Sequence, residues 1–120
     1  YMEHCDKERL AVGKALGLEL YSLLETVNSQ RSEKKATLYE AFKNNALYDG
    51  LKGPVSLSDR SLSEDLPCGL GSLLDLADMM HVPAPYITAM VDTASLYMGK
   101  PYEPFLTVQD LRAIKALRGK

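Results

Sequence analysis

The sequence has few of the residues that mark metal-binding or disulfide-rich proteins. It contains no tryptophan, two histidines and two cysteines in 120 residues. Cys5 and Cys68 lie 63 positions apart, and the sequence contains no CxxC motif and no Cys/His spacing typical of a zinc site. We therefore expect two reduced, partly buried thiols in a cytoplasmic protein and no metal, with a disulfide as the alternative.

Excess charge of one sign and long apolar runs are also missing. The 14 basic and 16 acidic side chains nearly cancel. The densest basic cluster is only Arg31, Lys34 and Lys35, which argues against nucleic acid as a partner. No apolar run approaches the ~18 residues of a membrane span. No signal peptide is visible, and no glycine period or long repeat indicates a collagen or a solenoid.

The apolar residues, 46% of the chain, recur at helical spacing almost everywhere. Gly17 stands where a left-handed cap would end the first helix, and Thr37 and Glu40 match a capping box. The sequence therefore predicts an all-α protein, an irregular bundle of five or six helices without a sheet. The predicted helices cover about residues 2–16, 21–27, 38–42, 63–80, 85–98 and 107–117.

Two of these predicted helices carry most of the apolar surface. The helix that starts near residue 63 takes Ser63 as its N-cap and presents Leu70, Leu73, Leu74, Ala77 and Met80 on one face. Prolines at residues 83 and 85 separate it from the next helix. That helix has the strongest amphipathic face of the chain, which consists of Ile87, Met90, Val91, Ala94, Tyr97 and Met98.

Few residues suggest chemistry by themselves. Gly69-Leu70-Gly71 lacks the third glycine and the preceding strand of a dinucleotide-binding loop, so this chain alone is not expected to bind such a cofactor. We interpret the methionines as core residues rather than as a cofactor site. His4 is expected to be solvated. His81 lies at a helix end, where its imidazole would hydrogen-bond the last carbonyls; a chemical role is the alternative.

Residues 52–67 differ from the rest, because glycine, proline, arginine and acidic side chains gather there before a helix begins. Arg60 can bind a carboxylate through two parallel hydrogen bonds. Asp65, at a helix start, would stay ionised and could orient a base. The structural alternative is an ion pair of Arg60 with Asp65 or with Asp59.

The same segment resembles the signature of a known family. KGP at residues 52–54, Arg60, and LSEDLPCGL at residues 62–70 resemble the C-terminal helical domain of opine dehydrogenases, the octopine/nopaline dehydrogenase family. DKERLAVGKALG at residues 6–17 is similar to an upstream helix of that domain. VPAP at residues 82–85, DTAS at residues 92–95 and Gly99 are similar to a downstream helix pair. The resemblance covers roughly residues 5–100 in register.

This resemblance implies an oxidoreductase of two domains. An N-terminal Rossmann domain, absent from these 120 residues, would hold NAD or NADP, and the helical domain would supply the substrate side of the cleft. In the family, an amino acid condenses with a 2-keto acid such as pyruvate, and hydride reduces the imine. A histidine paired with an aspartate handles the protons, and an arginine binds a substrate carboxylate. Matching the motifs assigns the aspartate to Asp65 and the arginine to Arg60.

The sequence departs from the family pattern at several positions, and these departures limit the activity that we expect of the chain. The family's histidine lies upstream of the matched residues, and neither His4 nor His81 has matching surroundings. Ser61 stands where an aromatic residue is common, and Cys68 where a larger or hydroxylated residue is common. We therefore expect residues 1–120 to form a single helical domain, a piece of a longer two-domain dehydrogenase, that is inactive alone.

Two other functions are kept as hypotheses. The first is a non-catalytic helical module that forms homo- or hetero-oligomers through its apolar helix faces. The second is a related reductase that acts on a simple 2-keto acid without amine condensation.

Overall fold

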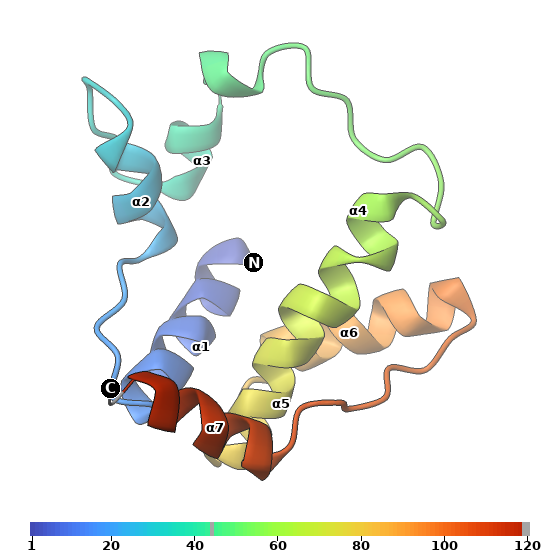
Figure 1. The fold of residues 1–120 in the computed structure, drawn as a ribbon. Helices are drawn as coiled ribbons and strands as arrows, with labels where there is room; N and C mark the ends of the chain where they lie inside the picture. The colour runs from blue at the N-terminus through green and yellow to red at the C-terminus, as the bar shows by residue number, and fades with distance from the viewer. Residues whose placement is uncertain (44, 119–120) are drawn as a thin grey trace.

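The computed structural model describes residues 1–43 and 45–118. Within these ranges the chain is helical and contains no strand, which confirms the predicted fold class. If α4, η2 and α5 are counted as one helical run, there are six α-helical stretches (Figure 1). The elements are α1 (Met2–Ala15), α2 (Leu23–Ser29), α3 (Leu38–Phe42), the 3₁₀ helix η1 (Ala46–Tyr48), α4 (Arg60–Ser63), the π-helix η2 (Leu66–Gly71), α5 (Ser72–Met79), α6 (Pro85–Met98) and α7 (Val108–Arg118).

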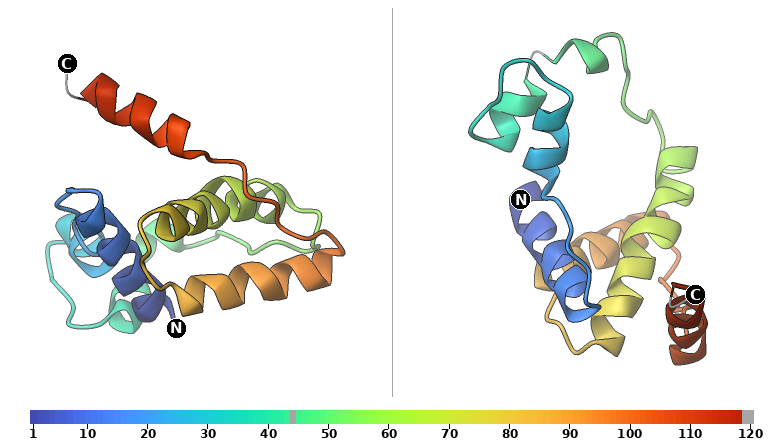
Figure 2. Two further views of the ribbon diagram at one scale, coloured as in Figure 1. Left: turned by 90° about the horizontal axis from the view of Figure 1, so that it is seen from below. Right: turned by 60° about the vertical axis from the view of Figure 1, so that its left-hand side comes forward.

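The helices form an open arrangement rather than a closed bundle. Helices α1, α5 and α6 lie at its centre, with α2 and α3 at one end (Figure 1). A long exposed loop then crosses from η1 to α4. Helix α7 stands apart from the other helices in both views of Figure 2. No helix within residues 1–43 and 45–118 is long and apolar enough to cross a membrane.

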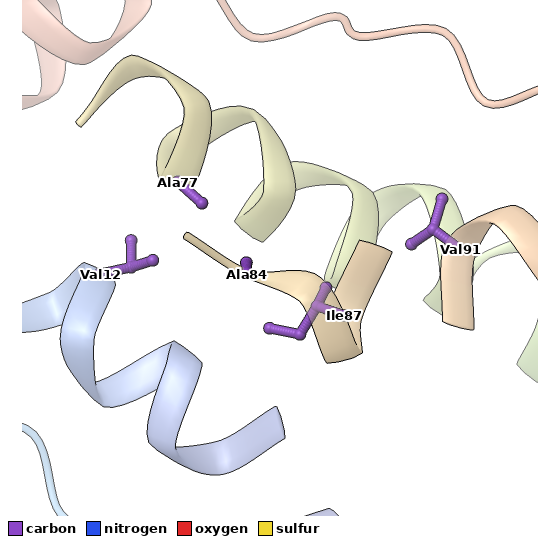
Figure 3. Close-up of a cluster of buried hydrophobic side chains, with 5 residues drawn as sticks. All are labelled: Val12, Ala77, Ala84, Ile87 and Val91. Carbon is purple, nitrogen blue, oxygen red and sulfur yellow. The ribbon is translucent and has the colours of Figure 1, made fainter. Parts of the chain in front are cut away.

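The core is small and lies where α1, α5 and α6 meet (Figure 3). Its buried members are Val12, Ala77, Ala84, Ile87 and Val91. Leu70, Leu73 and Leu74 pack against it, as the predicted face of the α5 region requires. The predicted face of α6 is wrong in part, because Met90 and Tyr97 are 42% and 75% exposed. Ile87 and Val91 of that face are buried in the core that α1, α5 and α6 form.

The buried carboxylate of Glu8 connects α1 to α6. It accepts hydrogen bonds from the backbone N–H groups of Tyr86 at 2.8 Å and Ile87 at 2.9 Å. Amides in the first turn of a helix have no acceptor within that helix. The N-cap residue of α6 is Ala84, whose side chain makes no capping hydrogen bond. Glu8 therefore supplies, from a distant part of the sequence, the cap and the negative charge that the start of α6 lacks.

A second buried carboxylate, Asp75, holds the segment that connects α6 to α7. Its oxygens accept hydrogen bonds from the Tyr102 hydroxyl at 2.8 Å and from the N–H groups of Phe105 and Leu106 at 3.1 and 3.0 Å. Burial, together with this carboxylate, raises the pKa of Tyr102, so its hydroxyl stays protonated as a donor. The Tyr102 ring lies against Gly71, where a Cβ atom would collide with it.

Helices α1 and α5 end in the same backbone motif. At α5, the N–H of Val82 donates to the Ala77 carbonyl at 2.9 Å, and the N–H of His81 donates to the Asp78 carbonyl at 3.2 Å. His81 thus caps the helix through its backbone, and the prediction that its imidazole makes the cap is wrong. Its φ of 54° is in the left-handed region. Gly17 has the predicted left-handed conformation at the end of α1.

Replacing His81 by glycine should stabilise the protein. Glycine adopts a positive φ without the contact between Cβ and carbonyl that costs other residues roughly 1 kcal/mol. We expect His81→Gly to raise the free energy of unfolding by about 1 kcal/mol in urea titrations followed by far-UV circular dichroism. His81→Ala, which keeps the Cβ atom, should give no gain. An equal gain in both variants would show that backbone strain at this position is not the cause.

Removing the Tyr102 hydroxyl should destabilise the protein. Tyr102→Phe keeps the ring on Gly71 but deprives the buried Asp75 carboxylate of one of three donors. We expect a loss of about 1–2 kcal/mol in the free energy of unfolding, measured in the same titration. Tyr97→Phe is the matched control, because Tyr97 is 75% exposed, and it should change stability by less than about 0.5 kcal/mol. Equal stability of the two variants would contradict the role of this contact.

Candidate functional site

The helix that carries Arg60 starts earlier than predicted. Asp59 is the N-cap residue of α4, and its carboxylate accepts hydrogen bonds from the Ser61 N–H at 3.0 Å and the Ser61 hydroxyl at 2.7 Å. Ser63 is the last residue of α4, so its predicted role as N-cap is wrong. The aspartate takes this role because its side chain reaches a first-turn amide. Arg60 is therefore the first residue of a helix rather than part of a loop.

The Arg60 side chain points into solvent. Its guanidinium Nε lies 3.2 Å from Oε2 of Glu64, one turn along, and the two side chains are 85% and 59% exposed. The predicted alternatives, ion pairs with Asp65 or Asp59, are wrong. An exposed pair at this spacing contributes only about 0.3–0.5 kcal/mol. A ligand carboxylate that makes two charge-assisted hydrogen bonds can therefore displace Glu64 from Arg60.

Asp65 is exposed and lies between α4 and η2. It precedes η2 as its N-cap residue, but its side chain makes no capping hydrogen bond. Pro67 occupies the first turn of η2 and has no N–H that needs an acceptor. Within residues 1–43 and 45–118 no donor or cation is bound to the Asp65 carboxylate, so it is free to accept one.

The structure places Arg60 and Asp65 on one helical run but does not bring them together. Glu64 and Asp65 both keep right-handed helical dihedral angles, so the backbone between Arg60 and Asp65 stays helical. Side chains five positions apart on a regular helix diverge by about 140°. A ligand or side chain that contacts both must therefore lie along the flank of this helical run.

Neither side chain lines the best-formed hollows of the described surface. A hollow of about 260 Å³ lies beside them and is bordered by Ser63, Leu66 and Pro67. Tyr102 and Phe105, from the connector after α6, close its far side. Arg60 and Asp65 thus both lie on an open surface rather than inside a hollow.

The described residues offer no site for a metal or a dinucleotide. They contain no group of three or more His, Cys, Asp or Glu that could hold a metal ion. In the part of the chain that the structure describes there is also no strand that could lead into a phosphate-binding helix. Both cysteines are free thiols, which confirms the prediction, although Cys68 is exposed rather than partly buried.

The start of α4 should depend on pH through Asp59. Hydrogen bonds from the Ser61 hydroxyl and the Ser61 N–H lower the pKa of Asp59 below the ordinary value of 3.8. Because the folded-state pKa is the lower one, the cap is complete above the ordinary pKa and is lost as the pH falls through the folded value. We expect the amide NMR signal of Ser61 to titrate below pH 3.8, and Asp59→Asn to abolish this step. A midpoint at or above that value would contradict the cap.

Comparison with known proteins identifies the family. The family described as "NAD/NADP octopine/nopaline dehydrogenase, alpha-helical domain" matches residues 1–98, which include Arg60 and Asp65. The chain is 38% identical over 93 residues to the "Opine dehydrogenase" of Arthrobacter sp. (strain 1C). This alignment covers 78% of the chain but 26% of the relative, so the chain spans about a quarter of that relative's length. No solved structure matches the chain significantly.

The resemblance seen in the sequence is thereby confirmed. The matched residues contain α1 to α6, whereas the connector after α6 and α7 lie beyond them. The chain belongs to the NAD/NADP octopine/nopaline dehydrogenase family and corresponds to its alpha-helical domain.

Proposed function

We propose that this chain forms the substrate side of the active site in an NAD(P)-dependent opine dehydrogenase. In the proposed reaction, an amino acid and a 2-keto acid condense to an imine with loss of water; NAD(P)H, bound outside these 120 residues, would supply the hydride, and a general acid the proton, that convert the imine to a secondary amine. The observation that supports this most is the exposure of Arg60 and Asp65 on one helical run within the matched domain.

Arg60 is proposed to bind a substrate carboxylate. Both reactants carry a carboxylate, and the planar guanidinium can donate two parallel hydrogen bonds to one of them. Among the residues that the structure describes, the competitor is the exposed carboxylate of Glu64. Because the backbone of Arg60 is fixed by the Asp59 cap, a bound carboxylate would be held in a defined position beside the helix.

Asp65 is proposed to hold a catalytic histidine that these 120 residues do not contain. An ionised carboxylate that accepts from an imidazole fixes its tautomer and stabilises its charged form. The two histidines of the chain are placed elsewhere. His4 stacks on the Tyr86 ring, with centroids 4.3 Å apart, and His81 ends α5. The partner of Asp65 therefore belongs to another part of a longer polypeptide.

The residues of this chain do not fit the cofactor, so we assign none of them to it. NAD or NADP would be held by a Rossmann domain outside these 120 residues. Two unpaired thiols suit the reducing conditions of the cytoplasm, where we place the enzyme.

The reaction is tested with the longer polypeptide that contains this chain, by following NAD(P)H oxidation with a panel of amino acids and 2-keto acids. We expect oxidation only when both reactants are present. Oxidation with the keto acid alone would instead identify a simple keto-acid reductase. No oxidation with any pair would favour the non-catalytic module.

Substitutions at the two residues should separate their roles. Asp65→Asn should lower kcat by about 10³- to 10⁴-fold and leave the affinity for NAD(P)H unchanged, because only the orientation of the histidine is lost. Arg60→Lys should mainly raise the KM of one acid substrate, by about tenfold or more. Glu64→Gln is the control, since it frees Arg60 without removing it, and its KM should not rise. Near-normal turnover of Asp65→Asn would exclude Asp65 from the mechanism.

A further inference from the structure

A different hollow, which includes neither Arg60 nor Asp65, lies between α1, α2, the η2–α5 run and α6. Its volume is about 500 Å³. Most of its lining side chains are apolar; they include Met2, Cys5, Leu23, Leu70, Leu73 and Met90. The thiol of Cys5 in α1 lies 3.8 Å from the Met90 sulfur in α6. These side chains do not fill the space between the helices.

The charged groups at this hollow are already paired. The Asp6 carboxylate accepts from the Arg9 guanidinium and from the Leu23 N–H, both at 2.8 Å. The Arg9 guanidinium also donates to the Tyr21 carbonyl at 2.6 Å. A charged or strongly polar ligand would find no free partner at these two residues, so the occupant must be apolar.

The chain exposes more surface and is more extended than a compact protein of its size. The accessible surface is 8841 Å², about 2,400 Å² more than the ~6,450 Å² expected of a compact protein of this mass. The radius of gyration is 16.1 Å, against about 13.6 Å for a compact domain of 120 residues. A typical protein interface covers only about 800 Å² per partner. The open surface therefore suits a permanent contact with more polypeptide rather than a small ligand.

The position of the hollow in the sequence favours one source for that polypeptide. All of its lining residues lie within residues 1–98, the part that matches the family. The relative from Arthrobacter extends well beyond the 26% that this chain covers. A second copy of the chain is the alternative source, and it could insert its helix α7, where Leu117 is 70% exposed. We do not favour α7 because it lies outside the family match, whereas the hollow lies within it.

We propose that this hollow seats the apolar face of a helix from the part of the enzyme polypeptide that lies outside these 120 residues. The inference rests on the proposed function, because it takes the chain to be part of a longer enzyme. Docking of a helix into an apolar groove needs anchors at the i, i+3 or i+4 and i+7 positions of the incoming helix. The seated helix would close the gap between α1 and α6 and cover the exposed apolar side chains that line the hollow.

Alkylation of Cys5 by iodoacetamide tests this inference directly. Cys5 lines the hollow, and burial raises the pKa of its thiol, so all rates are compared at one fixed pH. Peptide-resolved mass spectrometry gives the rate in the 120-residue chain and in the longer polypeptide. We expect Cys5 to react at least about tenfold more slowly in the longer polypeptide, because the helix covers it. In the longer polypeptide, Met90→Lys should restore the reaction, whereas Leu96→Lys, also exposed on α6 but outside the hollow, should not.

The other outcomes are distinct. Equal Cys5 rates in both lengths, with NAD(P)H oxidation by the longer polypeptide intact, would overturn the seated helix and leave the proposed function standing. Slow Cys5 alkylation without any oxidation would support the helix and overturn the function. Protection of Cys5 in the 120-residue chain that increases with protein concentration would assign the hollow to a second copy and overturn the inference.

Discussion

The geometry of this domain depends on the carboxylate of Glu8, which caps a helix 78 residues away in the sequence. Helix α6 begins with Ala84 and Pro85, which supply neither a capping oxygen nor a first amide. By accepting the next two amides, Glu8 fixes the start of α6 against α1. The position of Ile87 and Val91 in the core follows from this anchor. Hydrogen bonds to buried carboxylates thus help to hold the helices together where the apolar core is small.

Asp75 is a second buried carboxylate that accepts backbone amides, here in the connector that follows α6. Its three hydrogen bonds fold the connector back onto α5, with the Tyr102 ring over Gly71 at the end of η2. The π-helix η2, which follows Asp65 directly, is therefore held between the core and the connector. The two exposed residues proposed to meet the substrate stand on a helical run that is fixed at its far end, whereas their side chains are left open to solvent.

The sequence predicts the helices well, because each has a local apolar periodicity and residues that favour a helix start or end. Gly17, Thr37 and Pro85 mark helix ends where the structure has them. The predicted start of α4 is wrong because two residues, Asp59 and Ser63, can each cap a helix there. Which of them does so depends on the backbone conformation that forms. Neither buried carboxylate was predicted, since a charged residue within a helix usually faces water, and its distant amide partners leave no local signal.

The site itself was predicted through family resemblance more than through physics. From the residues alone, an ion pair of Arg60 with Asp65 or Asp59 was the favoured interpretation, and the structure gives Arg60 a different partner, Glu64. Exposure of Met90 and Tyr97 on α6 could not be predicted either, because periodicity defines a face but not how much of it a neighbour covers.

We propose that Arg60 and Asp65 face the substrate in the completed active site. A crystal structure of the longer polypeptide with an N-(carboxyalkyl) amino acid bound would decide this. We expect two hydrogen bonds from the Arg60 guanidinium to a carboxylate of that molecule and a histidine N–H donating to Asp65. A bound product elsewhere, with Arg60 still paired to Glu64 and Asp65 in open solvent, would contradict it.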